Sequence, residues 1–327
     1  MLGIAPSTVS RALRAEGNIS PETRRMIQEA AMELGYSLPN APRRTPLEHV
    51  LVVFLSKWSA EFFGAAVLGM SAFGGEHGIR ITAPGRGEHL SPENLLPALT
   101  GTETCQAVII GLGSGDKLPV AELKQIEAAG VTVVLLNRHE GCHLSAVTID
   151  DYAAGETAAR HLYSLGHRRL ACVSWPDTYV CFHKRVAGFQ NGCRALGIYD
   201  PSLFVILNDF KGPLYTDGES RLDHFFTRPD PPTAIFTVSD MVAHEVINIA
   251  RRHGRDVPDD LAVIGFDNTE LAEHLGLTTF DFRRFELGRQ AIKLAKELYD
   301  GEVEPPVHIT LPPTLVCRNT TKRRPSS

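Results

Sequence analysis

Arg185 and Asp267 are the two charged residues of this chain that are best placed for ligand-binding chemistry. Asp267 directly follows the apolar run 261–266, which is typical of a buried strand, and parallel α/β sheets bind ligands outside the carboxyl ends of their strands. A fixed carboxylate beside a guanidinium can hold a polyhydroxylated or heterocyclic molecule through charge-assisted hydrogen bonds. The alternative is that the two side chains pair only with each other or with the backbone. Their positions alone leave both interpretations open.

Further side chains at or just beyond the ends of predicted strands are candidates for the same ligand. They are Phe62, Phe63, Asn137, Asp150, Tyr179 and Phe210. Aromatic rings offer apolar stacking faces for sugars or bases, and the polar side chains offer hydrogen bonds. Each ring taken singly is equally typical of a hydrophobic core, so these are weaker candidates than the charged pair.

Catalysis and metal binding are not predicted. The serine, histidine and aspartate residues form no nucleophile-elbow sequence, and the glycine-rich stretch 111–117 lacks the spacing of a phosphate-binding loop. The six cysteines show no CxxC spacing, so we expect reduced thiols rather than disulfides or a zinc site. We therefore expect no enzyme activity, no metal and no cofactor.

The N-terminal stretch carries side chains suited to nucleic-acid contact. Pro6 fits a first helical turn, and helical spacing then places Val9, Ala12 and Leu13 on one face. The opposite face presents small hydroxyls and guanidinium groups, which contact phosphates and guanine edges in a major groove. An ordinary surface helix is the alternative for this stretch taken alone. The candidate DNA contacts, including two arginines of the following linker, are Ser7, Thr8, Ser10, Arg11, Arg14, Asn18, Arg43 and Arg44.

A second short helix follows the first. Ser20 offers an N-cap oxygen, Pro21 fits the first turn, and Gly35 supplies the stop after Leu34. The apolar residues between these signals fall at helical spacing, so the two helices are predicted to pack through a small shared core.

From residue 49 onward, short continuous apolar runs alternate with helical stretches, and a second such series begins after Asp150. Continuous apolar strands with helices between them indicate parallel sheets that are covered on both faces. The sequence therefore predicts two α/β lobes in series.

Several stretches together carry a family resemblance. STVSRAL at 7–13, NISPETR at 18–24 and LGY at 34–36 resemble the DNA-binding head of the lactose-repressor (LacI/GalR) family of bacterial transcription regulators. The body is similar to the periplasmic-binding-protein-like body of the same family. The stretches that carry this second likeness are AVTIDD at 146–151, HLYSLGHRR at 161–169, KRVAGF at 184–189, PTAIF at 232–236 and VIGFDN at 263–268.

The resemblance implies an α/β protein with an incomplete N-terminal helix-turn-helix head and a two-lobed, periplasmic-binding-protein-like body built on parallel sheets. The expected divisions are a head at 1–36, a proline-rich hinge linker at 37–47, an N-terminal lobe at 48–150 and 282–310, and a C-terminal lobe at 151–281 and 311–327. Family heads have one more helix before the turn, whereas only Met1 and Leu2 precede Gly3 here. Either the start codon lies upstream or the head is degenerate.

The resemblance further implies a sequence-specific DNA-binding regulator, usually a repressor, that acts as a homodimer on a palindromic operator in double-stranded DNA. A small-molecule effector, a sugar or related metabolite, is expected between the lobes, and matching positions in relatives favour effector binding by Arg185 and Asp267. Ser239 stands where sugar-responsive relatives often carry Asn. The alternative function is a cytoplasmic small-molecule sensor that has lost DNA binding, which the proline-rich linker favours.

Charge is distributed unevenly along the chain. Residues 1–46 hold six arginines and four glutamates, or +2, and the whole chain carries −5, which leaves −7 for the remainder. A basic head on an acidic body fits DNA contact confined to one end. No apolar run reaches the roughly 18 residues that span a bilayer, and no signal segment opens the chain, so we expect a cytoplasmic protein without membrane contact.

Overall fold

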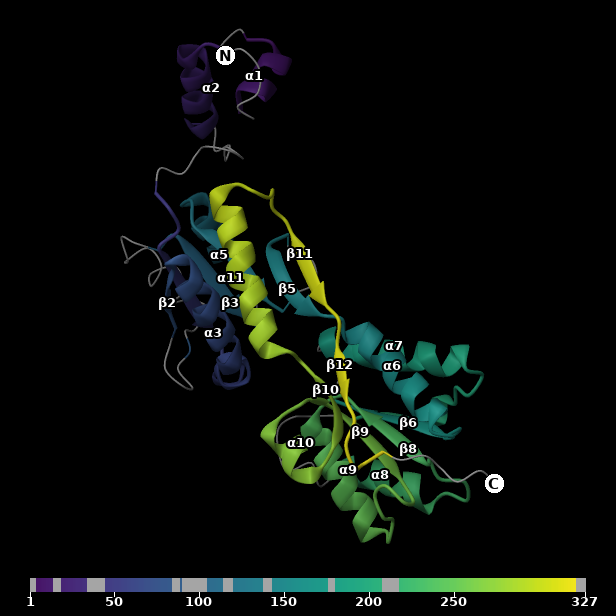
Figure 1. The fold of residues 1–327 in the computed structure, drawn as a ribbon. Coiled ribbons are helices and arrows are strands. Elements are labelled where there is room, and N and C mark those ends of the chain that lie inside the picture. The colour runs from purple at the N-terminus through teal and green to yellow at the C-terminus, as the bar shows by residue number, and fades with distance from the viewer. Residues whose placement is uncertain are drawn as a thin grey trace. The chain divides into compact units, whose positions relative to one another are not determined.

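The computed structural model of the chain describes residues 4–13, 19–33, 45–83, 89, 105–113, 120–137, 143–175, 180–207 and 218–321 (Figure 1). The chain divides into two compact units. Unit 1 comprises residues 1–148 and 284–309, and unit 2 comprises residues 149–283 and 310–327. Within the described residues each unit is built around one six-stranded, mainly parallel sheet, which confirms the predicted α/β fold.

The head consists, in its described part, of α1 (Pro6–Leu13) and α2 (Pro21–Glu33). Ala12 of α1 and Ile27 of α2 are fully or almost fully buried, so the two helices share a small apolar core as predicted. Ser20 Oγ accepts a hydrogen bond from the Thr23 N–H at 3.2 Å, which confirms the predicted N-cap of α2.

The sheet of unit 1 has the strand order β11-β5-β4-β3-β1-β2, and β1 to β5 pair in parallel. Its strands are β1 (His49–Phe54), β2 (Arg80–Thr82), β3 (Ala107–Gly111), β4 (Thr132–Leu136), β5 (Ser145–Ile149) and β11 (His308–Leu311). Its described helices are α3 (Lys57–His77), α5 (Val120–Ala128) and α11 (Arg284–Asp300). Every residue of β3 and β4 is buried, which explains the continuous apolar runs in the sequence.

The sheet of unit 2 has the order β12-β10-β9-β8-β6-β7, in which only the edge strand β12 runs antiparallel to its described neighbour. Its strands are β6 (Leu170–Ser174), β7 (Phe204–Ile206), β8 (Ala234–Thr237), β9 (Ala262–Asp267), β10 (Thr278–Asp281) and β12 (Thr314–Val316). Its described helices are α6 (Asp151–Ser164), α7 (Val180–Ala195), α8 (Gly218–Thr227), α9 (Asp240–Arg252) and α10 (Glu270–Leu275), with a short 3-10 turn, η1, at Pro201–Leu203.

Two glycines bring α6 and α7 unusually close together. A Cβ at Gly155 of α6 would meet the backbone carbonyl oxygen of Arg185, and a Cβ at Gly188 of α7 would meet the carbonyl oxygen of Tyr152. Because neither residue has a side chain, the two helix backbones touch, and Arg185 of α7 lies beside the first turn of α6. The two glycines therefore help to position Arg185, one of the two charged residues predicted to bind a ligand.

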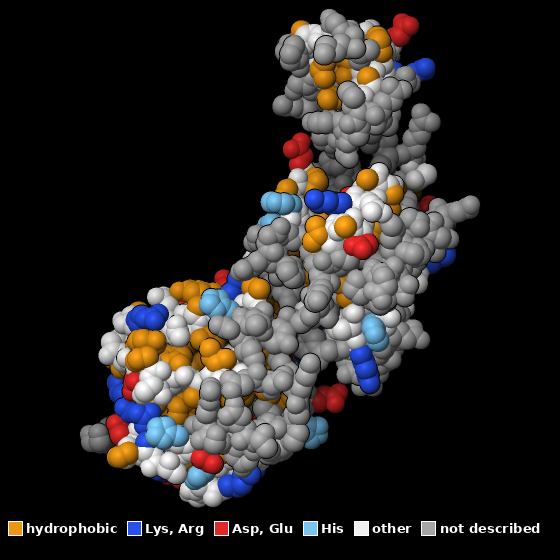
Figure 2. All heavy atoms as spheres, turned by 180° about the vertical axis from the view of Figure 1, so that it is seen from behind, with side chains coloured by type: hydrophobic (Ala, Val, Ile, Leu, Met, Phe, Trp, Pro, Cys, Tyr) orange, Lys and Arg blue, Asp and Glu red, His pale blue; other side chains and the backbone are white. Residues whose placement is uncertain are grey.

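The surface of the described residues mixes charges of both signs. On the face shown in Figure 2, Lys and Arg side chains are interspersed with Asp and Glu rather than gathered in a field of one sign. Leu68 of α3 and Met241 of α9 are the most exposed of the described large apolar side chains, at 65% and 55%. None of the described helices is long and apolar enough to cross a lipid bilayer.

We expect Gly155→Ala to destabilise unit 2, because the new methyl group forces two helix backbones apart. Overpacking typically costs about 1–3 kcal/mol, which outweighs the roughly 1 kcal/mol that Ala gains over Gly in a helix. Denaturant unfolding measures the difference. Gly64→Ala in α3 is the matched control, because nothing lies within 4 Å of its Cβ position. It should be neutral or stabilising, and an equal loss in both variants would contradict the close-approach argument.

Candidate functional site

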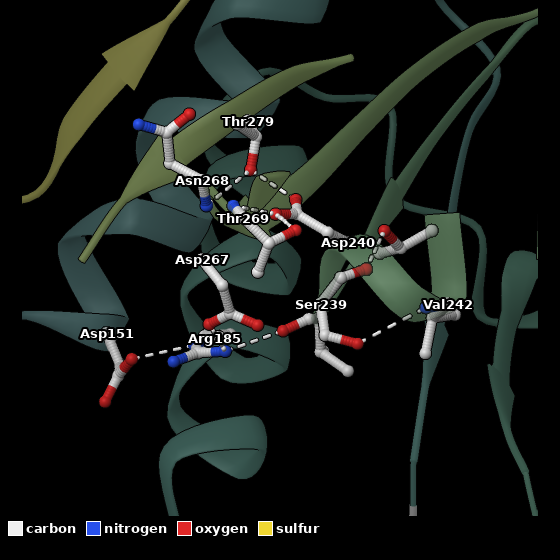
Figure 3. A network of polar contacts seen from close by, with 11 residues as sticks. Asp151, Arg185, Ser239, Asp240, Val242, Asp267, Asn268, Thr269 and Thr279 are labelled. Atoms are coloured by element: carbon white, nitrogen blue, oxygen red, sulfur yellow. Dashed lines mark hydrogen bonds and ion pairs between the residues drawn. The ribbon is translucent and has the colours of Figure 1, made fainter. Parts of the chain in front are cut away.

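The guanidinium of Arg185 is the centre of a buried polar cluster at the carboxyl end of the unit 2 sheet (Figure 3). Arg185 is 2% exposed. Its Nε donates to Asp151 Oδ1 at 2.7 Å, its Nη1 donates to the Val238 carbonyl oxygen at 2.6 Å, and Nη1 lies 3.8 Å from Asp267 Oδ1. The guanidinium carbon also lies 3.4 Å from the centre of the Phe266 ring, in a cation–π contact.

The electrostatics of this cluster keep Arg185 charged. Burial alone would lower the pKa of its guanidinium, but the carboxylates of Asp151 and Asp267 raise that pKa above its ordinary value. A desolvated cation of this kind requires close counter-charges, since an unpaired buried charge is strongly unfavourable. Arg185 therefore pairs within the protein, with Asp151 and with the second candidate, Asp267, and ligand binding by the two candidates stays a prediction.

Asp267 lies at the end of β9 in an unusual backbone conformation. Its φ angle is 112° and that of the next residue, Asn268, is 51°, values that favour glycine. The Asp267 side chain keeps 14% of its surface exposed, whereas that of Arg185 keeps 3%. Asp267 is thus the more exposed member of the pair, and its carboxylate lies within ion-pair distance of the buried Arg185 guanidinium.

A second buried carboxylate, that of Asp240, contacts the turn that follows β9, at residues 267–269. Asp240 is the first residue of α9 and is 1% exposed. Its Oδ2 accepts hydrogen bonds from the backbone N–H and the hydroxyl of Thr269, and its Oδ1 accepts one from the hydroxyl of Thr279 (Figure 3). The ends of β8 and β9 meet here because the two strands are neighbours in the sheet.

The other predicted ligand contacts are placed as follows. Asp150 accepts a hydrogen bond from the Ala153 N–H at 2.9 Å and caps α6. Asn137, at φ 71°, follows β4 in unit 1 and accepts a hydrogen bond from the Thr148 hydroxyl. Phe62 is half-buried, 5.1 Å from the guanidinium carbon of Arg284, and Phe63 is fully buried. Phe63 therefore fills the core of unit 1 and offers no stacking face. Tyr179 and Phe210 lie outside the described residues.

The predicted DNA contacts are only partly described. Thr8 and Arg11 lie on α1, where Thr8 is half-buried and Arg11 is exposed. Ser7 and Ser10 also belong to α1, but their side chains lie outside the described part of the structure. The remaining candidates that fall outside the described residues are Arg14, Asn18, Arg43 and Arg44.

Sequence reasoning missed two residues of the site, Asp151 and Asp240. Asp151 stands next to the predicted Asp150, and only the helix geometry decides which of two adjacent acids faces Arg185. Asp240 follows Ser239, whose side chain accepts a hydrogen bond from the Val242 N–H and caps α9. An acidic residue in the first turn of a helix commonly interacts with the helix dipole. The sequence therefore contains no separate indication that Asp240 also contacts the turn that follows β9.

These features define a class, the two-lobed periplasmic-binding-protein-like proteins that carry a helical head. Residues 159–321 match the profile of the periplasmic binding protein-like domain, and residues 2–40 match that of the bacterial regulatory proteins of the lacI family. The chain is 30% identical to the HTH-type transcriptional regulator CelR of Thermobifida fusca over 98% of this chain and 96% of that protein. It is 28% identical to the HTH-type transcriptional repressor CytR of Escherichia coli K12, over 91% and 87% of the two chains.

A solved structure gives the same result. The complex of the transcriptional regulator CelR with cellobiose matches 98% of this chain and 97% of that one, with 29% identity and a TM-score of 0.69. The chain therefore belongs to the LacI family of bacterial transcription regulators, as the sequence predicted.

We expect Arg185→Met to destabilise unit 2 by about 3–5 kcal/mol, because it leaves the Asp151 carboxylate buried without its cation. Chemical denaturation followed by circular dichroism measures the loss. Arg194→Met is the matched control on the same helix. Arg194 is exposed and stacks 4.2 Å from the Tyr199 ring centre, a contact whose loss should cost less than about 1 kcal/mol. Similar losses in both variants would show that the buried cluster contributes no more than a surface contact.

Proposed function

We propose that this protein is a transcriptional repressor whose affinity for its operator is set by a neutral, polyhydroxylated metabolite bound at the carboxyl edge of the unit 2 sheet. The observation that carries the proposal is the pair formed by Arg185 and Asp267, a buried cation that orients a partly exposed carboxylate at a strand end. Strand ends of parallel sheets are the usual ligand sites of such folds. The prediction that the ligand lies between two lobes stays a prediction.

The charge of the cluster favours a neutral ligand. Asp151 and Asp267 flank the single guanidinium of Arg185, which leaves a formal charge of −1 when both carboxylates are ionised. Burial raises the pKa of Asp151, and protonation of Asp151 would make the cluster neutral, so in neither state does it carry a net positive charge. Lys184 and Asp150 act on Asp151 with opposite signs, so they leave that balance unchanged. An anionic ligand such as a sugar phosphate would add repulsion to the approach of Asp267. Hydroxyl groups, in contrast, donate hydrogen bonds to a carboxylate. The solved CelR structure holds cellobiose, a ligand of this neutral class, in a relative.

Regulation requires that the ligand bind two states of the protein with different affinity. Operator binding by paired heads requires a homodimer, because two half-sites are read together. The exposed side of α3 supports self-association, since no charged residue occurs between Gly64 and Gly75 and Leu68 is 65% exposed. We expect that side of α3 to contact a second copy of the chain.

Calorimetry with cellobiose as the neutral probe and glucose 6-phosphate as the anionic probe tests the ligand class. A DNA fragment from upstream of the protein's own gene, followed by fluorescence anisotropy with and without each sugar, tests the regulation. Binding of glucose 6-phosphate in preference to cellobiose would contradict the charge argument.

We expect Asp267→Asn to weaken cellobiose binding tenfold or more. A hydrogen bond to a charged group contributes about 1.5–3 kcal/mol, and about 1.4 kcal/mol corresponds to a factor of ten. Asp230→Asn is the control, because the side chain of Asp230 is 70% exposed and pairs with Arg169 on the surface of unit 2. Unchanged cellobiose affinity in Asp267→Asn would remove Asp267 from the ligand site.

We expect Arg11→Ala to weaken binding to the preferred operator by about 1–3 kcal/mol and to relax the preference at one base position. The exposed guanidinium on α1 is suited to a guanine edge. Anisotropy titrations against operators substituted one base pair at a time, at fixed salt, measure both effects. A uniform loss across all the operators would instead identify Arg11 as a phosphate contact.

A further inference from the structure

The turn that carries Asp267 is held in a conformation that its own residues do not favour. Asp267 and Asn268 both have positive φ angles, 112° and 51°, and neither is glycine. Such a backbone persists only when its surroundings fix it more strongly than the residues resist it. The contacts that fix this turn therefore determine where the Asp267 carboxylate points.

Asp240 supplies the first set of these contacts. Its Oδ2 accepts from the Thr269 backbone N–H at 2.8 Å and from the Thr269 hydroxyl at 2.9 Å, and its Oδ1 accepts from the Thr279 hydroxyl at 2.5 Å. Gly265 of β9 makes room for the carboxylate, since a Cβ there would collide with Asp240 Oδ1. A nearly fully buried carboxylate thus ties the start of α9 to Thr269, the N-cap residue of α10.

Thr279 supplies the second set, from the neighbouring strand β10. Its single hydroxyl proton is donated to Asp240, and its oxygen accepts the Asn268 backbone N–H at 3.4 Å. The Asn268 side chain is held in turn, because its Oδ1 accepts from Arg318 Nη2 at 2.8 Å. The two backbone N–H groups that follow Asp267 are therefore bound by Thr279 and Asp240 respectively.

Figure 3 shows that this clamp and the ligand candidate lie on different sides of the turn. The Asp267 carboxylate points toward Arg185, whereas the carboxylate of Asp240 points toward Thr269 and Thr279. Asp240 and Thr279 have no contact with Arg185 among the interactions drawn. Their influence on a ligand would act through the backbone of residues 267–269.

We propose that Asp240 and Thr279 are positioning residues for effector binding, because they preset the strained Asp267–Asn268 turn in its ligand-binding conformation. This inference rests on the proposed role of Asp267 in the ligand site. Without the clamp the turn relaxes, and the apparent affinity falls by the fraction of molecules that keep the competent conformation. A purely structural role would lower stability and leave the affinity of the folded protein unchanged.

Thr279→Val and Thr279→Ser form the matched pair that tests the clamp. Valine keeps the shape of threonine and removes the hydroxyl, whereas serine keeps the hydroxyl and removes the methyl group. In the full chain, hydrogen exchange of the Asn268 and Thr269 amides should accelerate at least tenfold in Thr279→Val and stay within about twofold of wild type in Thr279→Ser. Unchanged exchange in Thr279→Val would overturn the clamp.

Cellobiose affinity, measured by calorimetry well below the melting temperature of each variant, tests the consequence for the ligand. It should fall about tenfold in Thr279→Val and in Asp240→Asn, but not in Thr279→Ser. The single amide oxygen of Asn can accept from Thr269 or from Thr279 but not from both, so its N–H₂ would face the other donor. Faster exchange with unchanged affinity would overturn the positioning role. If Asp267→Asn itself leaves cellobiose binding unchanged, the ligand-site proposal fails. The exchange experiment still decides separately whether Thr279 holds the turn.

Discussion

The buried guanidinium of Arg185 is the constraint on which the candidate site depends. A cation that is 2% exposed cannot be left without counter-charges, because the cost of desolvating an ion amounts to several kcal/mol even after relaxation. The chain meets this requirement with groups from separate elements. These groups are Asp151 from α6, the Val238 carbonyl after β8, and Phe266 and Asp267 from β9. Contacts with the same guanidinium therefore hold each of these elements in position.

The parallel topology of unit 2 explains why these groups can meet. Neighbouring parallel strands deliver their carboxyl ends to one edge of the sheet, so the residues after β8 and β9 lie next to each other. Helix α7 reaches that edge because Gly155 and Gly188 allow it to touch α6. The result is two polar layers. One joins Arg185 to Asp267, and the other joins Asp240 directly to Thr279 and Thr269; the turn at residues 267–269 connects the two.

The sequence predicted the fold, the family and the two charged candidates, because these depend on features that are local or repeated. Apolar runs of strand length predicted the sheets, and Asp267 was found because it directly follows such a run. Asp150 is predicted as a ligand contact because it ends a strand, but the sequence does not indicate that the next residue, Asp151, pairs with Arg185, since only the geometry of the helix start decides which way two adjacent acids face. Phe63 was selected because a ring near a strand end suits a ligand, yet its side chain is completely buried. Its neighbour Phe62 is only half-buried. The packing of α3, which the sequence does not show, decides which of these two adjacent rings is exposed.

A fixed geometry at the carboxyl edge of the unit 2 sheet limits how a ligand bound there could change operator affinity. A ligand shifts an equilibrium only by the difference between its affinities for the two states. Because Arg185, Asp151 and Asp240 all belong to unit 2 and are fixed within it, that edge would have the same geometry in both states of a two-state regulator. Contacts made by this edge alone therefore contribute affinity without contributing switching. The differential contacts that control the operator must then come from groups outside this network.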